Sequence, residues 1–249
     1  MILENCYNGS IRRVILEGDS SAMKTKELQA KERAKIAVQI LENRYPEAIC
    51  SLDYEDPFRL MVSVRLSAQC TDERVNMITP ELFKRYPTIT DFTEADQGEL
   101  EKYIFSCGFY HSKAKDIIGA AKAVNERFGG KIPDDMEQLL SIPGVGRKSA
   151  NLLLGDIYGK PAVVADTHCI RISNRLGLCE TVDPYKVEMA LKAILPPEKS
   201  NDFCHRLVLF GREICTARSP KCSECPLFEI CLSKPQSEKS DRIKKGRTK

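Results

Sequence analysis

Apolar residues recur along this chain at the spacing of one helix face. In residues 112–128, Ile117, Ala121, Val124 and Phe128 follow one another at intervals of three or four, as on the buried side of an amphipathic helix. Two glycines come directly afterwards, and glycine often ends a helix because it adopts the left-handed conformation without strain. The pattern therefore predicts one long helix with a defined end.

Proline, glycine and capping residues divide the rest of the chain into similar segments. Asp56 and Pro57 are typical of a helix start, with an N-cap residue followed by proline at the first helical position. Together these patterns predict helices over residues 27–44, 58–69, 72–85, 98–107, 112–128, 134–141, 167–176, 184–195 and 201–214, and another that contains Ala150, Leu153, Leu154 and Ile157. The sequence gives little indication of β-strands, and residues 162–165 are the only run that could form one. We expect an all-α protein with disordered segments at residues 1–26 and 234–249.

Composition and charge narrow the class of protein only slightly. Hydrophobic residues make up 42% of the 249, and no apolar run approaches the roughly 20 residues that span a bilayer. The first 22 residues lack the apolar core of a signal peptide. We therefore expect a cytoplasmic protein.

The net charge of +3 does not by itself indicate a nucleic-acid partner. From residue 234 to the end there are seven Lys or Arg and two acidic residues, so this tail carries +5 and the rest of the chain carries −2. A basic tail can contact phosphates without sequence preference, although such charge blocks are more often simply disordered. Any DNA-binding face must therefore depend on where individual groups lie.

Four of the eleven cysteines fall within seventeen residues, at Cys215, Cys222, Cys225 and Cys231. In a reducing compartment such clustering suggests a metal site before disulfides. Thiolates are soft ligands that suit both zinc and iron–sulfur clusters. Structural zinc sites usually present their ligands in close pairs, and only Cys222 and Cys225 form one. The spacing favours an iron–sulfur cluster and leaves zinc open.

The sequence SIPGVGRK joins two of the predicted helices. Gly144 and Gly146 allow backbone conformations that other residues resist, and they flank Val145 before Arg147. Backbone N–H groups at a helix start can bind an anion, so this turn is a candidate phosphate site. A tight turn without any ligand is the alternative.

Two ionisable residues could take part in chemistry, one directly after this turn and one in a separate segment further along the chain. Lys148 lies about one turn into the following helix, and it could attack carbon only after losing its proton. A further phosphate contact is the simpler role for it. Asp166 follows an apolar run and precedes a helix, a position typical of an N-cap. One of its oxygens can cap the helix while the other faces a cleft.

Five segments taken together resemble the endonuclease III family of DNA glycosylases, within the helix-hairpin-helix superfamily. They occur in the family's order, and their co-occurrence is far more specific than any one of them. The segments are LSAQCTD at 66–72, GFYHSKA at 108–114, IPGVGRKSA at 142–150, VADTH at 164–168 and the cysteine segment at 215–231. The resemblance covers about residues 28–233.

This resemblance implies a two-lobed helix-hairpin-helix glycosylase fold. A six-helix domain is expected at 50–160, and an iron–sulfur cluster domain is expected to combine 27–49 with 161–233. DNA would lie across the cleft between them. The cysteine spacing is the one that this family uses for a [4Fe-4S] cluster, so the resemblance assigns the four cysteines to that cofactor.

The resemblance also changes the expected role of the two ionisable residues. Lys148 falls at the family's catalytic lysine, and Asp166 falls at its catalytic aspartate. The implied enzyme is a bifunctional DNA glycosylase and AP lyase of base excision repair, which removes oxidised pyrimidines and cuts 3′ to the abasic site by β-elimination. Its partner would be double-stranded DNA with a damaged base or an abasic site. It would act as a monomer and associate with the nucleoid when bound to DNA.

Three further positions carry over from the resemblance. Gln69 matches the residue that enters the hole left by a flipped nucleotide. Phe109 matches a wedge residue at which relatives commonly have an aliphatic side chain, and an aromatic wedge is physically reasonable. His168 also matches, with a local structural role as its expected function.

Two other functions are open alternatives. An adenine-mismatch glycosylase shares the hairpin, the aspartate and the cluster but lacks a lysine at this place, so Lys148 and the short C-terminus argue against it. A non-catalytic DNA-binding module with a zinc loop would bind DNA without cutting it, and it would be colourless.

Overall fold

The computed structural model describes residues 29–235, and this part of the chain is helical with no strand. The expected extension at 1–26 and all but two residues of the expected tail lie outside the described residues. The prediction of an all-α fold is confirmed. No helix within 29–235 has both the length and the apolarity that crossing a bilayer requires.

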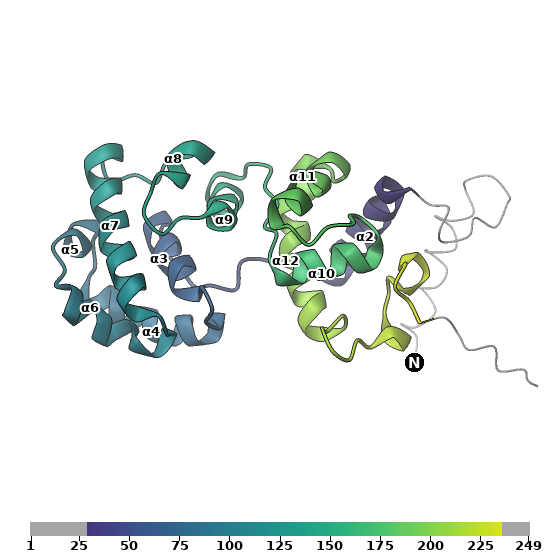
Figure 1. Cartoon of the computed structure of the whole chain (residues 1–249), viewed down its shortest axis with the longest axis horizontal. Coiled ribbons are helices and arrows are strands. Elements are labelled where there is room, and N and C mark those ends of the chain that lie inside the picture. The colour runs from purple at the N-terminus through teal and green to yellow at the C-terminus, as the bar shows by residue number, and fades with distance from the viewer. Residues whose placement is uncertain (1–28, 236–249) are drawn as a thin grey trace, which may run out of the picture.

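The first lobe contains the seven α-helices from α3 to α9, and it is drawn in blue and teal in Figure 1. The longest helix of this lobe, α7, packs against α5 and α6 and also contacts α3. The helices are α3 (Pro57–Ser67), α4 (Asp72–Arg85), α5 (Ile89–Thr93), α6 (Gln97–Ile104), α7 (Tyr110–Phe128), α8 (Met136–Leu140) and α9 (Arg147–Tyr158), with a 3₁₀ turn, η1, at Phe105–Cys107.

The second lobe combines an early helix with the C-terminal part of the described chain (Figure 1). Helix α12 packs against α10 and α2, so segments from both ends of the chain share one core. The elements are α2 (Ala30–Arg44), α10 (Thr167–Leu176), α11 (Pro184–Ile194), η2 (Pro197–Lys199), α12 (Ser200–Glu213), η3 (Cys222–Glu224) and η4 (Phe228–Ile230). The arrangement resembles the expected two domains, whose bounds stay a prediction.

Capping side chains explain why several helices begin where they do. The Asp56 carboxylate accepts a hydrogen bond from the Arg59 backbone N–H, which supplies the predicted N-cap of α3. Helix α5 was not predicted. It is held by a capping box in which Thr88 and Asp91 each bond the other's backbone.

Two segments, 45–56 and 159–166, connect the lobes. The apolar run in the second of them forms no strand, although Ala162, Val163 and Val164 are buried. Helix α9 contacts α12 across the lobe boundary. Gly155 permits this approach, because a Cβ there would lie 2.1 Å from the Asn201 Oδ1 atom.

Candidate active site and cluster loop

A cavity of about 210 Å³ lies where the two lobes meet. Its walls come from α9, α10 and α12, and from both connecting segments. Lys148 and Asp166 both line it, together with His168 and His205. The structure thus brings the two residues expected to carry the chemistry to one cavity, although they belong to different helices.

Lys148 lies in the first turn of α9, which begins at Arg147 with Gly146 as its N-cap, the start that the sequence predicted. Its side chain is exposed. The same helix buries Ala150, Leu153 and Leu154 on its other side. This packing fixes the helix while its first turn projects into the cavity.

Asp166 is the N-cap of α10, as its position predicted. Its Oδ1 atom accepts a hydrogen bond from the Cys169 backbone N–H at 2.7 Å. The residue is half-buried and also lines the cavity. The capping bond orients the carboxylate, so the cap and the cavity-lining position coexist in one side chain.

His168 comes two residues after Asp166 and lies next to an arginine side chain. Its Nδ1 atom lies 3.1 Å from Arg171 Nη2. Burial lowers the pKa of His168 below its ordinary value, and the nearby Asp166 carboxylate opposes this only in part. The imidazole is therefore mainly neutral at neutral pH.

The glycine-rich turn has the geometry of an anion site. Gly144 adopts a φ of +76°, and Gly146 is the N-cap of α9, where no side chain caps the helix. Val145 between them is buried. The first amides of α9 are therefore left for a partner, as the phosphate-site prediction requires.

Two arginines near the turn have partners within the protein. Arg147, expected to contact DNA, forms a bidentate ion pair with Glu188. Arg65 pairs with Asp116 at 2.7 Å, and both side chains lie against Gly144. Arg147 therefore positions α9 through its guanidinium, and its DNA contact stays a prediction.

Gln69 and Phe109 share an unusual backbone conformation. They have φ angles of +55° and +48° and are the only residues other than glycine with positive φ in the described part of the chain. Both are exposed, and the Phe109 side chain is 67% accessible. Strained residues of this kind concentrate at functional sites, which supports the expectation that both face DNA.

The four cysteines of the loop lie close to one another. Cys225 interacts electrostatically with the other three thiols, and none of the four forms a disulfide. Leu227 and Ile230 anchor the loop in the core, and Arg175 Nη1 lies 3.2 Å from Cys215 Sγ. Within 29–235, no three His, Cys, Asp or Glu side chains come close enough to hold a single metal ion. Four neighbouring thiols on one loop form a donor set that suits an iron–sulfur cluster.

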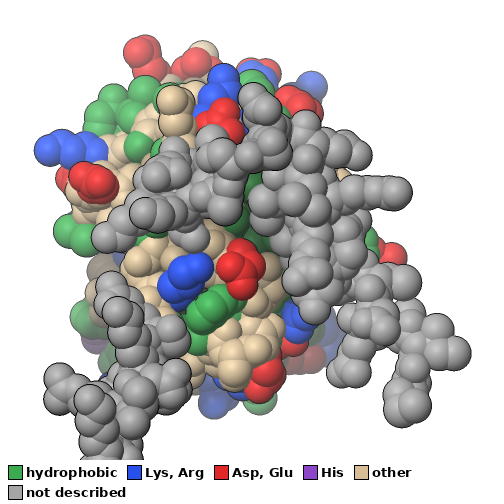
Figure 2. Space-filling model, turned by 90° about the vertical axis from the view of Figure 1, so that its right-hand side faces the viewer, with side chains coloured by type: hydrophobic (Ala, Val, Ile, Leu, Met, Phe, Trp, Pro, Cys, Tyr) green, Lys and Arg blue, Asp and Glu red, His purple; other side chains and the backbone are tan. Residues whose placement is uncertain are grey.

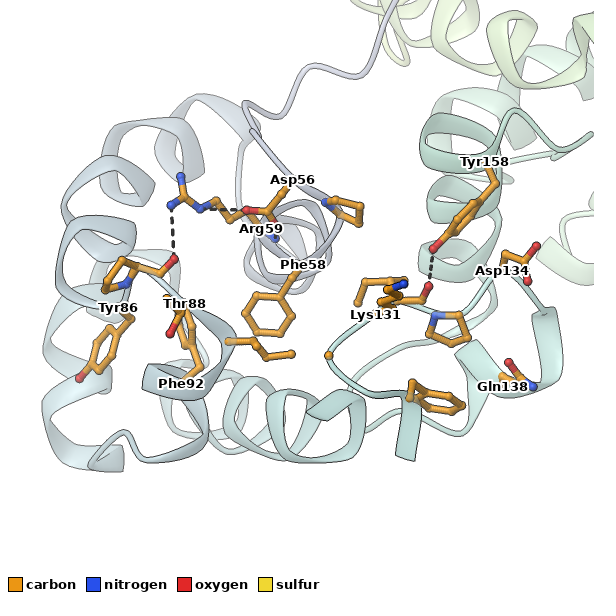
Figure 3. Close-up of a pocket in the computed structure, with 17 residues that line it drawn as sticks. Asp56, Phe58, Arg59, Tyr86, Thr88, Phe92, Lys131, Asp134, Gln138 and Tyr158 are labelled. Carbon is orange, nitrogen blue, oxygen red and sulfur yellow. Dashed lines mark hydrogen bonds and ion pairs between the residues drawn. The ribbon is translucent and has the colours of Figure 1, made fainter. Parts of the chain in front are cut away.

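A larger cavity of about 740 Å³ lies in the first lobe (Figure 3). Phe58 and Phe92 point into it, and Arg59 and Asp56 pair at its edge. It contains none of the residues predicted to bind DNA or carry out chemistry. Size alone therefore does not mark the functional site.

The described residues show no extended basic surface on the face drawn in Figure 2. Lys and Arg side chains there alternate with Asp and Glu. This agrees with the nearly balanced overall charge.

Comparisons with known proteins identify the family. A model of the HhH-GPD superfamily of base excision DNA repair proteins matches residues 62–197, and a model of the iron–sulfur binding domain of endonuclease III matches residues 215–231. Endonuclease III of Synechocystis sp. is 44% identical over 214 residues, which cover 86% of this chain and 98% of the relative. The chain belongs to the endonuclease III family. Endonuclease III of Bacillus subtilis is 42% identical, with 81% of this chain and 92% of the relative covered.

Solved structures of the family agree with this membership. A non-covalent endonuclease III–DNA complex aligns with a TM-score of 0.79 and 38% identity, over 83% of this chain and 97% of that one. A trapped endonuclease III–DNA covalent intermediate aligns equally well. The model of the iron–sulfur binding domain begins at Cys215 and ends at Cys231. The cofactor of this endonuclease III family member is therefore an iron–sulfur cluster and not zinc.

Several residues that shape the site were missed by sequence reasoning. Glu188 holds Arg147, and Asp72 and Arg212 form an ion pair of 2.8 Å at the cavity wall. The two residues of each ion pair are 41 and 140 positions apart in the sequence, respectively. No local pattern could have indicated such pairs.

Proposed function

We propose that this endonuclease III family member is a bifunctional DNA glycosylase and AP lyase that acts on oxidised pyrimidines in duplex DNA. The observation that carries the proposal is the shared cavity of Lys148 and Asp166. An amine and a carboxylate at one lobe junction can supply a nucleophile and a stabilising charge to a single sugar. A covalent complex with DNA, as trapped for the related endonuclease III, is what an amine nucleophile would form.

The first step breaks the glycosidic bond. The damaged nucleotide leaves the duplex and enters the cavity. The neutral Lys148 amine attacks the sugar C1′, and the electron pair of the C1′–N bond leaves with the base, which takes up a proton. Asp166 stabilises the positive charge that develops on the sugar or accepts the proton from Lys148.

The second step cuts the strand through the same amine. Ring opening gives a Schiff base between Lys148 and C1′, which acidifies the C2′ proton. Loss of that proton forms a C2′–C3′ double bond and expels the 3′ phosphate with the C3′–O electron pair. Hydrolysis of the Schiff base then releases the amine. A single lysine thus serves both the glycosylase and the lyase reaction.

The remaining predicted residues hold the DNA in this proposal. The amides of Gly146 and Arg147 receive a phosphate at the start of α9. Gln69 fills the hole left by the flipped nucleotide and bonds the orphaned base, while Phe109 enters as an apolar wedge. Cys215, Cys222, Cys225 and Cys231 would hold a [4Fe-4S] cluster, which serves to order the loop around it. We expect the enzyme to act as a monomer in the cytoplasm.

Borohydride trapping tests the lysine chemistry directly. Incubation with a duplex that contains thymine glycol or an abasic site, followed by reduction, should yield a covalent protein–DNA adduct. Lys148→Ala should abolish the adduct, whereas Lys122→Ala should not, because Lys122 is exposed and does not line the cavity. Absence of an adduct with the unaltered protein, or its persistence in Lys148→Ala, would remove the proposal.

A further inference from the structure

Lys113 is a completely buried lysine in α7, with a relative exposure of 0%. Its Nζ atom donates hydrogen bonds to two backbone carbonyls, those of Leu66 and Cys107, each at 2.8 Å. It does not line the cavity that contains Lys148. The proposed chemistry therefore does not use this ammonium.

The two carbonyls belong to the segments that carry the proposed DNA-inserting residues. Leu66 lies three residues before Gln69, and Cys107 lies two residues before Phe109. These segments are far apart in sequence, at the end of α3 and in η1. The thiols of Cys70 and Cys107 also interact, so the two segments are adjacent. One ammonium thus bonds both segments that carry the only two non-glycine residues with positive φ in 29–235.

Burying this charge is unfavourable in itself. Burial lowers the pKa of Lys113, and within 29–235 no carboxylate bonds its ammonium. An apolar side chain of similar length would fill the same space without that desolvation cost. The ammonium therefore contributes something that packing does not supply, namely a fixed separation between two loops that otherwise have strained backbones.

We propose that Lys113 is a positioning residue that fixes the spacing of the Gln69 and Phe109 loops, so that both side chains enter the duplex in one step. This inference rests on the proposed function, in which those two residues replace the flipped nucleotide. Lys113 acts on base flipping and leaves the reaction at Lys148 unchanged. Substrates that need no flipping should therefore be insensitive to its loss.

The test compares Lys113→Met on two DNAs that carry the same abasic site, one in a duplex and one in a single strand, where no hole has to be filled. Borohydride trapping should slow by about tenfold on the duplex, the effect expected when hydrogen bonds from a charged group are lost. It should change less than about twofold on the single strand. Lys115→Met is the matched control, because Lys115 is exposed on the same helix and loses the same charge.

A second comparison shows whether Lys113 acts through the two loops. In a background of Gln69→Ala and Phe109→Ala, the added Lys113→Met should cause little further loss on duplex DNA, because coupled residues are not additive. If Lys113→Met does not fold, Lys113→Gln replaces it, because an amide can still donate two hydrogen bonds. Its trapping should slow less than that of Lys113→Met, and again more on the duplex than on the single strand.

Three results separate the inference from the proposed function. An equal loss on both DNAs overturns the inference, and so does a full further loss in the double-variant background. No loss on duplex with Lys113→Met overturns it as well. In all three cases the proposed function still stands if the unaltered protein forms the adduct. If the unaltered protein forms no adduct with the duplex or with the single strand, both the inference and the proposed function are removed.

Discussion

Arg147 and Glu188 form a bidentate ion pair that joins the two lobes beside the proposed nucleophile. The Arg147 Nε atom donates to Oε2 at 2.7 Å, and Nη2 donates to Oε1 at 2.9 Å. The Glu188 side chain is only 3% exposed, and Lys192 bonds it at 2.7 Å. Because Arg147 immediately precedes Lys148, the pair fixes the first turn of α9 against α11.

Removing the charge of Glu188 should weaken the junction of the lobes. Glu188→Gln keeps the size of the side chain but leaves two cations with a weaker partner. We expect the free energy of unfolding to fall by about 1–3 kcal/mol, measured by urea denaturation. Glu99→Gln is the matched control, because Glu99 forms a similar bidentate pair with Arg85 that solvent screens. A larger effect for Glu99 than for Glu188 would contradict this argument.

The contribution of Glu188 should depend on pH. Burial alone would raise the pKa of Glu188, but hydrogen bonds from Arg147 and Lys192 lower it below the ordinary 4.5. The unfolded state therefore binds the proton more readily, so this stability is complete above that value and is lost as the pH falls through the lowered native pKa. The difference between Glu188→Gln and the unaltered protein should shrink over this acid range. A difference that stayed constant would show that the charge of Glu188 does not carry the effect.

The two roles of Asp166 can be separated by substitution. Asp166→Asn retains a good N-cap and loses the charge, so stability should hold while borohydride trapping slows by about a hundredfold or more. Asp166→Ala should lose the charge and also about 1 kcal/mol from the cap. Asp183→Ala is the control, because Asp183 caps α11 through the Lys186 N–H at 2.8 Å outside the cavity. Asp183→Ala should lose stability but keep normal trapping. Normal trapping by Asp166→Asn would show that the charge of Asp166 has no part in the mechanism.

Sequence reasoning located most helices and the candidate site but not the contacts that shape them. The interval Asp72–Arg85 was predicted to the residue, with Pro87 as the signal for its end, and in the structure Thr71 caps its start. By contrast, the positive φ angles of Gln69 and Phe109 have no local signal. The two hydrogen bonds that Lys113 donates to the neighbouring segments have no local signal either, because one of their acceptors lies 47 residues away. Pairing at such distances is set by the whole fold, so a pattern within one segment cannot reveal it.

The two glycines of the turn should differ in what they tolerate. At Gly144 the φ of +76° strains any other residue, and a Cβ would lie 2.8 Å from the Asp116 Cβ. Gly144→Ala should therefore destabilise the protein by about 1–3 kcal/mol and weaken binding to a duplex with an abasic-site analogue. A Cβ at Gly146 meets nothing within 4 Å, so Gly146→Ala should fold normally. Urea denaturation measures the stability of the two variants, and fluorescence anisotropy at several salt concentrations measures their binding to DNA. Equal binding by both variants and the unaltered protein would show that the turn does not contact DNA.

The cysteine loop should lose its order together with its cofactor. The purified protein should be yellow-brown and absorb at roughly 400 nm, as iron–sulfur proteins do. Cys222→Ala should lose this absorbance and lower the melting temperature, because Leu227 and Ile230 are buried and opening of the loop would expose them. Cys179→Ala is the control, since Cys179 is buried outside the loop and should keep the colour. A colourless unaltered protein that contains zinc by metal analysis would overturn the cofactor, whereas an unchanged spectrum in Cys222→Ala would remove only this ligand.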